Sequence, residues 1–289
     1  LSRDHLDYHK NYKSYLRAKL ILFRELTKKN GNLIFDNDLK YSKVLKKIAK
    51  RKKLNLLSIS TSNGQLKILS VKIFNNKQVV KFSYRKKKYQ FKTSLIGKIQ
   101  INNLMMAIAA ALKSKLKIDD IVKNLEHIKP TKGRLEVIGK TKNNSIIILD
   151  YAHTPEALKT CIENIKEQFP LRKINILFGC GGERDKEKRP IMTKIAYDLS
   201  THVIVTSDNP RSEDPEEIIK QMLSGLDTND YMPIIIKNRK KAIREGYLML
   251  EENDVMLIAG KGHENYQEIN KTRIPFSDIH EVKQLIKLK

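Results

Sequence analysis

In the second half of the chain, short unbroken apolar runs alternate with segments of helical periodicity. The apolar runs are residues 146–149, 174–178, 203–206, 234–236 and 255–259. The helical segments that follow the first four are residues 155–168, 190–199, 215–226 and 240–251, and a loop and a last helix follow the fifth run. Strands that are apolar on both sides are typical of a parallel sheet covered by helices. The pattern therefore predicts an α/β domain with a mostly parallel sheet.

The first half of the chain has a less regular pattern. It predicts helices over residues 12–28, 40–50, 101–113 and 118–128, and strands over 31–35, 54–59, 65–74, 78–84 and 88–91. Pro130, Lys132 and Gly133 then interrupt the periodicity. A chain of 289 residues is long enough for two ordinary domains. We expect these to be residues 1–132 and 133–289, with a hinge near residues 132–137.

The amino-acid composition indicates in which cellular compartment the protein is expected. No run of about 18 apolar residues occurs, so no membrane helix is expected. Two cysteines, Cys161 and Cys180, are too few for a disulfide framework, and a reducing, cytoplasmic location fits best. Cys180 lies among glycines, where a small residue closing a tight loop is favoured over a reactive thiol. The chain begins with a polar motif and no Met, so we expect it to be a fragment.

The formal charge of +25 raises the alternative of a basic module that binds nucleotides or nucleic acid. Lysine greatly outnumbers arginine, and the densest run, residues 85–88, lies between two predicted strands. A solvated lysine surface is therefore favoured, with no nucleic-acid partner expected. Salt-dependent binding to DNA would distinguish the alternative.

Polar motifs follow the apolar runs of the second half. Residues 150–155 (DYAHTP) follow the first run and open a helix, whose N-terminus suits a phosphate. In this motif Asp150 could bind ribose hydroxyls and His153 could bind a phosphate. The alternative is that the motif only caps the helix and contains a buried structural histidine. Residues 179–185 (GCGGERD), 208–211 (DNPR) and 260–264 (GKGHE) follow three further runs. Ligands of parallel sheets bind beyond the carboxyl ends of the strands.

These motifs together offer the groups that a zwitterionic amino acid needs. Arg184 and Arg211 can pair with its carboxylates, and Glu264 can accept from its ammonium. Each residue alone would be an ordinary surface ion pair. Their gathering at one predicted sheet edge favours an amino-acid site.

The motifs at residues 150–155, 179–190, 208–211 and 259–267 resemble, in order, the signatures of the Mur ligase family. The resemblance covers the whole chain and is strongest to members that add meso-diaminopimelate to UDP-N-acetylmuramoyl-L-alanyl-D-glutamate. It implies that residues 1–132 are the remainder of a central ATPase domain and residues 133–289 a C-terminal Rossmann-like domain. It also implies ATP-dependent amide ligation through an acyl phosphate. Residues 208–211 disfavour the lysine-adding relatives, and the intact motifs disfavour an inactive remnant.

The resemblance also assigns residues. It implies catalytic roles for Lys19 and His153, and ATP binding by Asn103, Arg134 and Asp150. Gln100 stands where the family often has Asn, which implies an altered adenine pocket. The amino acid would be bound by Arg184, Asp208, Asn209, Arg211, Gly260 and Glu264, with Asn209 and Arg211 reading its distal stereocentre and carboxylate.

Metal binding is expected at the start of the chain. The resemblance implies that His5 ligates Mg²⁺ and that a carbamylated Lys19 helps to hold a second ion; Asp4, His5, Asp7 and His9 by themselves could equally form a zinc site. The expected partners are UDP-N-acetylmuramoyl-dipeptide and meso-diaminopimelate, with a monomeric protein and no membrane. No phosphate-cradling G-x-x-G-K-[ST] loop occurs in the sequence. The chain alone is therefore predicted to be inactive.

Overall fold

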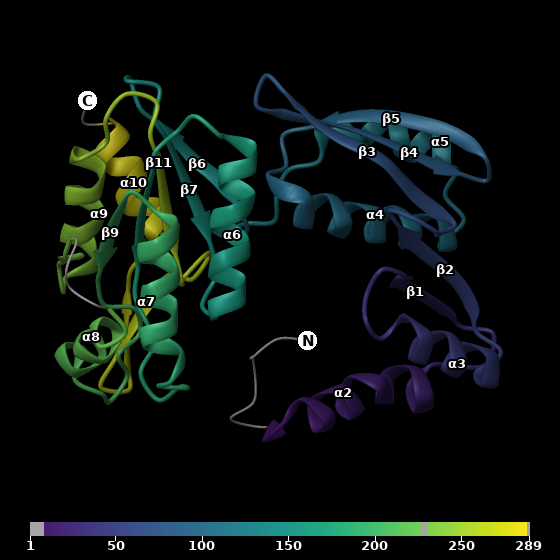
Figure 1. The fold of residues 1–289 in the computed structure, drawn as a ribbon, viewed down its shortest axis with the longest axis horizontal. Coiled ribbons are helices and arrows are strands. Elements are labelled where there is room, and N and C mark those ends of the chain that lie inside the picture. Colours follow the sequence, from purple (N-terminus) through teal and green to yellow (C-terminus); the bar gives the residue numbers. More distant parts are fainter. Residues whose placement is uncertain (1–8, 227–230, 288–289) are drawn as a thin grey trace. The chain divides into compact units, whose positions relative to one another are not determined.

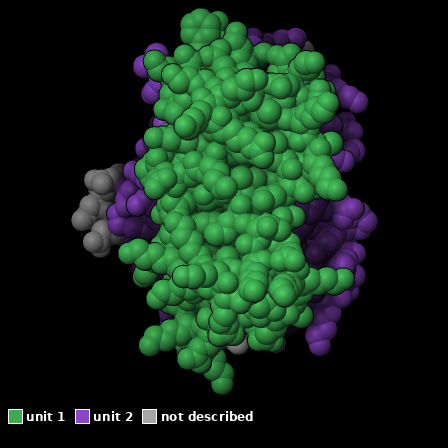
Figure 2. All heavy atoms as spheres, turned by 90° about the vertical axis from the view of Figure 1, so that its right-hand side faces the viewer, with its two compact units in different colours: residues 1, 8–129 green, residues 2–7, 130–289 purple. Residues whose placement is uncertain are grey.

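The computed structural model describes residues 9–226 and 231–287, and Figure 1 shows its ribbon. The chain divides into two compact units, coloured separately in Figure 2, with the division between Lys129 and Pro130. Each unit has its own sheet and its own buried core. No helix in the described ranges is both long and apolar enough to cross a bilayer.

The first unit is built on a mixed sheet of five strands in the order β1-β2-β3-β4-β5. The first three strands pair in parallel and the last two continue as antiparallel hairpins. Arg85 and Lys86 form the turn between β4 and β5, both at positive φ, so the densest basic run of the sequence forms a hairpin turn and the start of β5. The strands are β1 (Asn32–Asp36), β2 (Asn55–Ser60), β3 (Leu66–Phe74), β4 (Lys77–Tyr84) and β5 (Lys87–Thr93).

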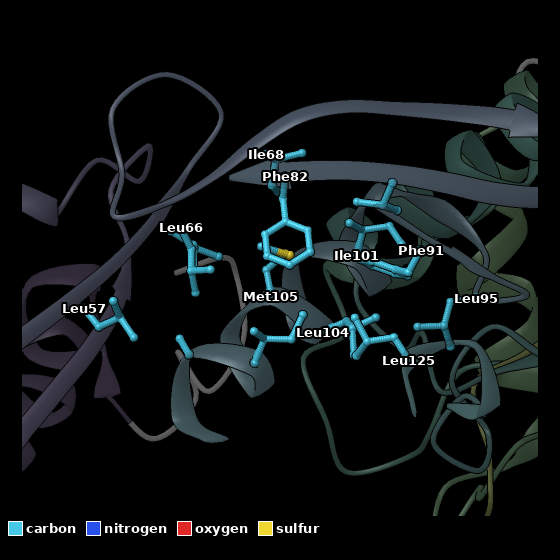
Figure 3. Close-up of a cluster of buried hydrophobic side chains, with 14 residues drawn as sticks. Leu57, Leu66, Ile68, Phe82, Phe91, Leu95, Ile101, Leu104, Met105 and Leu125 are labelled. Carbon is cyan, nitrogen blue, oxygen red and sulfur yellow. The ribbon is translucent and has the colours of Figure 1, made fainter. Parts of the chain in front are cut away.

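The core of the first unit lies between this sheet and helix α4 (Gly97–Lys113). Figure 3 shows Phe82 of β4 pointing toward Met105 of α4, and both side chains are fully buried. The predicted helix 12–28 ends as a π-helical turn, closed where the Thr27 hydroxyl donates to the Leu22 carbonyl at 2.6 Å. The other helical elements are α2 (Tyr12–Ile21), η1 (Leu22–Leu26), α3 (Ser42–Lys52), α5 (Ile118–Asn124) and η2 (Leu125–His127).

The second unit contains a six-stranded sheet in the order β10-β9-β8-β11-β7-β6, parallel except for β6. The predicted mostly parallel sheet is confirmed. Strands β7, β8 and β11 are buried along their whole length, which accounts for their unbroken apolar runs. The strands are β6 (Glu136–Lys140), β7 (Ile146–Asp150), β8 (Ile174–Phe178), β9 (His202–Val205), β10 (Ile234–Ile235) and β11 (Val255–Ala259).

Helices cover both faces of this sheet (Figure 1). Three pack side by side on one face: α6 (Pro155–Gln168), α7 (Lys188–Leu199) and α8 (Pro215–Leu223). On the other face, α9 (Arg239–Leu248) and α10 (Asp278–Lys287) contribute Ile243 and Val282 to the core. The sheet thereby has two apolar sides, as the sequence pattern indicated.

Three strands were not predicted from the sequence. Edge strand β6 is half-exposed and carries a bulge between Val137 and Gly139, so it lacks an apolar run. Strands β12 (Tyr266–Ile269) and β13 (Thr272–Pro275) form an antiparallel hairpin. Its turn residues, Asn270 and Lys271, adopt positive φ without a glycine, so the usual sequence signal of a hairpin is missing.

Candidate ligand site at the carboxyl edge of the six-stranded sheet

The order of strands along the chain changes at β11, the last strand of this sheet in the sequence, which lies between β7 and β8 and parallel to both. The chain leaves β7 and β8 toward α6 and α7 on one face, whereas α10, which follows β11, lies on the other (Figure 1). Loops that diverge in this way open a crevice beyond the strand ends. Because Ala259 pairs with Asp150 and Ile258 with Leu177, the motif loops meet at this edge.

A buried polar network joins the loop after β9 to the loop after β11. The Lys261 ammonium is fully buried and donates to Asn209 Oδ1 at 2.9 Å and to Glu264 Oε2 at 3.0 Å. The Nδ2 atom of Asn209 donates to the same Glu264 oxygen at 2.9 Å. Burial by itself would raise the pKa of Glu264, but hydrogen bonds from Asn209 and Lys261 and the lysine charge bring it below its ordinary value.

Asp208 and Gly260 lie at the base of this network. Gly260 has a φ of 109°, and a Cβ atom there would lie 2.7 Å from Asp208 Oδ2. Asp208 Oδ1 accepts from the Asn209 backbone N–H at 2.7 Å, and the Gln267 side chain donates to the Asp208 carbonyl at 2.8 Å. Both residues therefore shape the loops that carry Asn209 and Glu264, and glycine is needed at position 260.

The Arg211 guanidinium lies beside the glycine loop that follows β8. Its Nη1 atom donates to the Gly182 carbonyl at 2.6 Å, and its Nε atom lies 3.6 Å from Glu268 Oε2. The residue has a φ of 54°, and its backbone bridges to Ile269 of the hairpin. The hairpin that the sequence analysis missed thus holds this arginine in place.

Arg184 has a different environment. It is exposed, and its Nη1 atom donates to the carbonyl of its own neighbour, Glu183, at 3.0 Å. In the part of the chain that the structure describes, it forms no hydrogen bond or ion pair with Asn209 or Glu264. The structure therefore brings Asp208, Asn209, Gly260 and Glu264 together and sets Arg211 on the adjoining loop, but it leaves Arg184 outside the network.

The residues expected to bind ATP lie at the end of β7. Asp150 is buried and its Oδ2 atom accepts from the Leu135 N–H at 2.8 Å. Burial raises the pKa of this carboxyl, against the lowering effects of the Leu135 hydrogen bond and the Arg134 charge. His153 Nδ1 lies 2.9 Å from the Tyr151 carbonyl, which can only accept. A neutral His153 ring therefore has its proton on Nδ1 and presents Nε2 as an acceptor.

Tyr151, which the sequence analysis did not single out, lies between the two groups of residues. Its ring packs against the Arg134 guanidinium at 4.8 Å and edge-on against His153 at 4.9 Å. Its hydroxyl donates to Glu264 Oε1 at 3.4 Å. One aromatic side chain thus connects the predicted nucleotide and amino-acid residues. The only sequence signal was its place inside the DYAHTP motif.

Two buried cations near α7 were also missed. Arg189 is fully buried and binds Glu213 through both ends of its guanidinium, at 2.9 and 3.1 Å, and the Gly181 carbonyl at 3.1 Å. Lys188 donates to the His153 carbonyl at 2.8 Å. Both belong to the motif 179–190, but the sequence does not show that their side chains turn inward.

Residues predicted on the first part of the chain belong to the first unit or lie outside the described residues. Lys19 is exposed on α2, with its Nζ atom 5.3 Å from the centre of the Tyr15 ring. On α4, Asn103 is exposed and Gln100 is buried. His5, the expected magnesium ligand, lies outside the described residues.

Cys180, within the glycine loop, is buried, with its Sγ atom 4.0 Å from Met192 Sδ. Burial raises the pKa of its thiol to about 12. A thiol held in this form is a poor nucleophile, so the geometry supports the loop-closing interpretation of this cysteine.

Two sequence models of known domains match the chain. The Mur ligase middle domain matches residues 1–111, and the Mur ligase glutamate ligase domain matches residues 133–262. The chain belongs to the Mur ligase family. This Mur ligase chain is 38% identical to the UDP-N-acetylmuramoyl-L-alanyl-D-glutamate–2,6-diaminopimelate ligase of Rickettsia rickettsii, over 99% of the chain and 59% of that protein. It is 40% identical to the ligase of the same name from Aquifex aeolicus, over 99% of the chain and 57% of that protein.

Solved structures of Mur ligases have the same fold. A structure of a UDP-N-acetylmuramoyl-L-alanyl-D-glutamate–2,6-diaminopimelate ligase matches all of this chain and 59% of its own, with a TM-score of 0.66 and 32% identity. The MurF ligase from Thermotoga maritima in complex with ADP matches 99% of this chain and 59% of its own, with a TM-score of 0.71 and 17% identity. The Mur ligase chain therefore spans somewhat more than half the length of these relatives.

Proposed function

We propose that this chain supplies the amino-acid site and part of the nucleotide site of an ATP-dependent ligase. The enzyme would add meso-diaminopimelate to UDP-N-acetylmuramoyl-L-alanyl-D-glutamate during peptidoglycan synthesis, in the cytoplasm. The observation that carries this proposal is the buried Asn209–Lys261–Glu264 network, with Arg211 on the adjoining loop. The names of relatives matched over 99% of the chain support the same reaction.

The proposed reaction has two steps. The γ-carboxylate of the D-glutamyl residue attacks the γ-phosphorus of ATP, which releases ADP and forms an acyl phosphate. A neutral amine of diaminopimelate then attacks the acyl carbon, and inorganic phosphate leaves as the amide bond forms and the amine loses a proton. Both steps need charged reactants held close together in a fixed orientation.

At the amino-acid end, charge complementarity supports the assignments. Glu264 is held as a carboxylate by its buried donors and suits an ammonium group. Arg211 has two nitrogens held by protein partners, and its Nη2 atom makes no hydrogen bond to the described residues. A guanidinium fixed in this way suits a carboxylate. Arg184 is exposed on the glycine loop and would have to turn inward to reach the same ligand.

At the nucleotide end, Asp150 and Arg134 fit complementary parts of ATP. The Asp150 carboxylate is oriented by backbone donors and keeps acceptor capacity for ribose hydroxyls. Arg134 is exposed and can meet phosphates. His153 would have to be protonated at Nε2 to donate to a phosphate. The family relative with 17% identity that holds ADP supports a nucleotide ligand.

Magnesium ions would neutralise phosphate charge in such a reaction. The described residues contain no cluster of three or more His, Cys, Asp or Glu side chains able to hold a metal ion. They do not form a magnesium site by themselves, so no step is assigned to the ion. The roles proposed for His5 and for a carbamylated Lys19 stay predictions.

Titration calorimetry of the chain with meso-diaminopimelate and with L-lysine tests the amino-acid site. We expect binding to prefer diaminopimelate, because its distal carboxylate can pair with Arg211. Arg211→Ala should weaken diaminopimelate binding by about tenfold or more and leave lysine binding nearly unchanged. Arg244→Ala, at an exposed position on α9, is the matched control.

The outcomes separate the parts of the proposal. Equal affinity for the two amino acids, or an equal loss for both in Arg211→Ala, would contradict the specificity assigned to Arg211. Preference for lysine would favour the lysine-adding relatives. An unchanged diaminopimelate affinity in Arg211→Ala would remove this arginine from the site.

A further inference from the structure

We propose that Lys261 is a positioning residue that locks the Asn209 amide with its NH₂ group toward the amino-acid site. This deepens the proposed function, on which it relies only for the identity of the ligand. Lys261 is fully buried. Its Nζ atom donates to Asn209 and Glu264, which lie on different loops, and lies 5.6 Å from the centre of the Tyr266 ring. A buried ammonium is costly unless acceptors surround it, so its orientation is strongly determined.

Hydrogen bonds to three partners fix the orientation of the Asn209 side-chain amide. Its Oδ1 atom accepts from Lys261 Nζ at 2.9 Å and from the Glu268 backbone N–H at 3.0 Å, and both of these groups can only donate. Its Nδ2 atom donates to Glu264 Oε2 at 2.9 Å. Turning the amide over would set its NH₂ group against two donors and its oxygen against a carboxylate. The amide therefore has one stable orientation.

The locked amide has a consequence for ligand choice. One hydrogen of the NH₂ group is donated to Glu264, and the other makes no hydrogen bond within the described part of the chain. Asn209 is 4% exposed, so water has little access to it. A ligand group at this point must accept a hydrogen bond, as a carboxylate does and an ammonium cannot. Lys261 thereby makes Asn209 a reader of the carboxylate that distinguishes diaminopimelate from lysine.

The Lys261 and Glu264 charges also neutralise each other within the network. Removing the lysine leaves Glu264 with hydrogen bonds from Asn209 and Tyr151, but with no countercharge at hydrogen-bonding distance among residues 9–226 and 231–287. The Asn209 oxygen keeps the Glu268 N–H as its one donor. The amide then loses much of its preference for a single orientation, and this change can be measured without any ligand.

The first test is a ligand-free NMR measurement on the whole chain, comparing wild type with Lys261→Met. The Asn209 side-chain NH₂ signals are assigned by their loss in Asn209→Asp. We expect hydrogen exchange of these NH₂ protons with water to become about tenfold faster or more in Lys261→Met. Lys283→Met, at an exposed position on α10, is the control and should leave the exchange rate unchanged. Unchanged exchange in Lys261→Met would overturn the proposal.

The second test measures the ratio of the dissociation constants for L-lysine and meso-diaminopimelate. Lys261→Met should lower this ratio by about tenfold, whereas a merely structural loss would weaken both ligands equally and keep the ratio. An unchanged ratio in a folded Lys261→Met chain overturns the proposal that Lys261 enables Asn209 to recognise the distal carboxylate. If the wild-type chain binds neither amino acid, the proposed amino-acid function fails and the exchange measurement alone decides the role of Lys261.

A second pair of variants covers the case in which Lys261→Met does not fold, as judged by circular dichroism. Lys261→Met combined with Glu264→Gln removes both charges together and is compared with Glu264→Gln alone. Faster exchange of the Asn209 NH₂ protons in the double variant supports the proposal that Lys261 fixes the orientation of the amide. Equal exchange in the two chains rules it out.

Discussion

One ion pair, Arg189 with Glu213, holds the glycine loop after β8 to the start of α8. Glu213 accepts from the fully buried Arg189 guanidinium and, at 2.5 Å, from the Glu183 backbone N–H. These donors lower the pKa of the Glu213 carboxyl from 4.5 to about 2, against the opposing effect of burial. A depressed pKa in the folded state means that the charged form stabilises the fold.

Glu213→Gln should lower the free energy of unfolding by about 2–3 kcal/mol at pH 7, because it leaves the Arg189 charge buried without its countercharge. The native pair contributes above pH 4.5, and this contribution fades as the pH falls toward about 2. The difference between wild type and variant, measured by urea unfolding from pH 7 to pH 3, should shrink accordingly. Glu217→Gln, whose side chain is 59% exposed on α8, is the control. A difference that does not depend on pH would rule out this electrostatic origin.

Single residues differ in how well the sequence predicts their place. Asn209 and Glu264 were predicted to share one site, and the structure joins them directly. For Lys261 the sequence predicts only a place in a loop motif, because a lysine in a chain of charge +25 has no feature that marks it as buried. Arg184 was predicted beside Arg211, but its side chain is exposed on the loop. Motif spacing specifies the loop, and packing specifies the direction of the side chain.

At the scale of elements, two loops pack directly on each other through glycine. The Gly182 N–H donates to the Asn209 carbonyl at 2.9 Å, and a Cβ atom at position 182 would overlap the Pro210 carbonyl oxygen. The sequence predicts these glycines at a sheet edge suited to a ligand. The structure shows that Gly182 allows the loops after β8 and β9 to touch.

Gly182→Ala should therefore destabilise the second unit by about 1–3 kcal/mol, because backbone atoms of Pro210 must move. Gly181→Ala is a matched control, since its Cβ atom would come nearest to Arg211 Nη1, a side-chain atom, at 3.0 Å, and would lie 3.7 Å from the closest backbone atom, the Asn209 carbonyl oxygen. Urea unfolding of both variants checks the difference. Equal loss of stability in the two variants would contradict the loop packing described.

Elements were predictable where burial was uniform. Strands β7, β8 and β11 were found from their apolar runs because helices cover both of their sides. Strand β6 and the β12–β13 hairpin are half-exposed or exposed, so they carry no such pattern. The hairpin matters for the site, because its residue Ile269 pairs with Arg211.

At the scale of the whole molecule, the chain is expected to hold ligands without completing a reaction. No G-x-x-G-K-[ST] run occurs in its sequence, and ATP ligases of this kind need such a loop around the phosphates. We expect phosphate release from ATP by the isolated chain to stay at the background rate. The Aquifex aeolicus ligase, of which the chain spans 57%, is the positive control with its own substrates. Turnover by the isolated chain would contradict this prediction.

The sequence by itself determined the parallel α/β sheet of the second unit, the order of the motifs and the family to which they belong. These properties depend on local patterns: apolar runs, helix starts and loop residues that follow strands. The tertiary structure decided which charges are buried, Lys261 and Arg189 among them, and how Tyr151 connects the two groups of site residues. Burial and side-chain direction depend on contacts between segments distant in sequence, which no local pattern records.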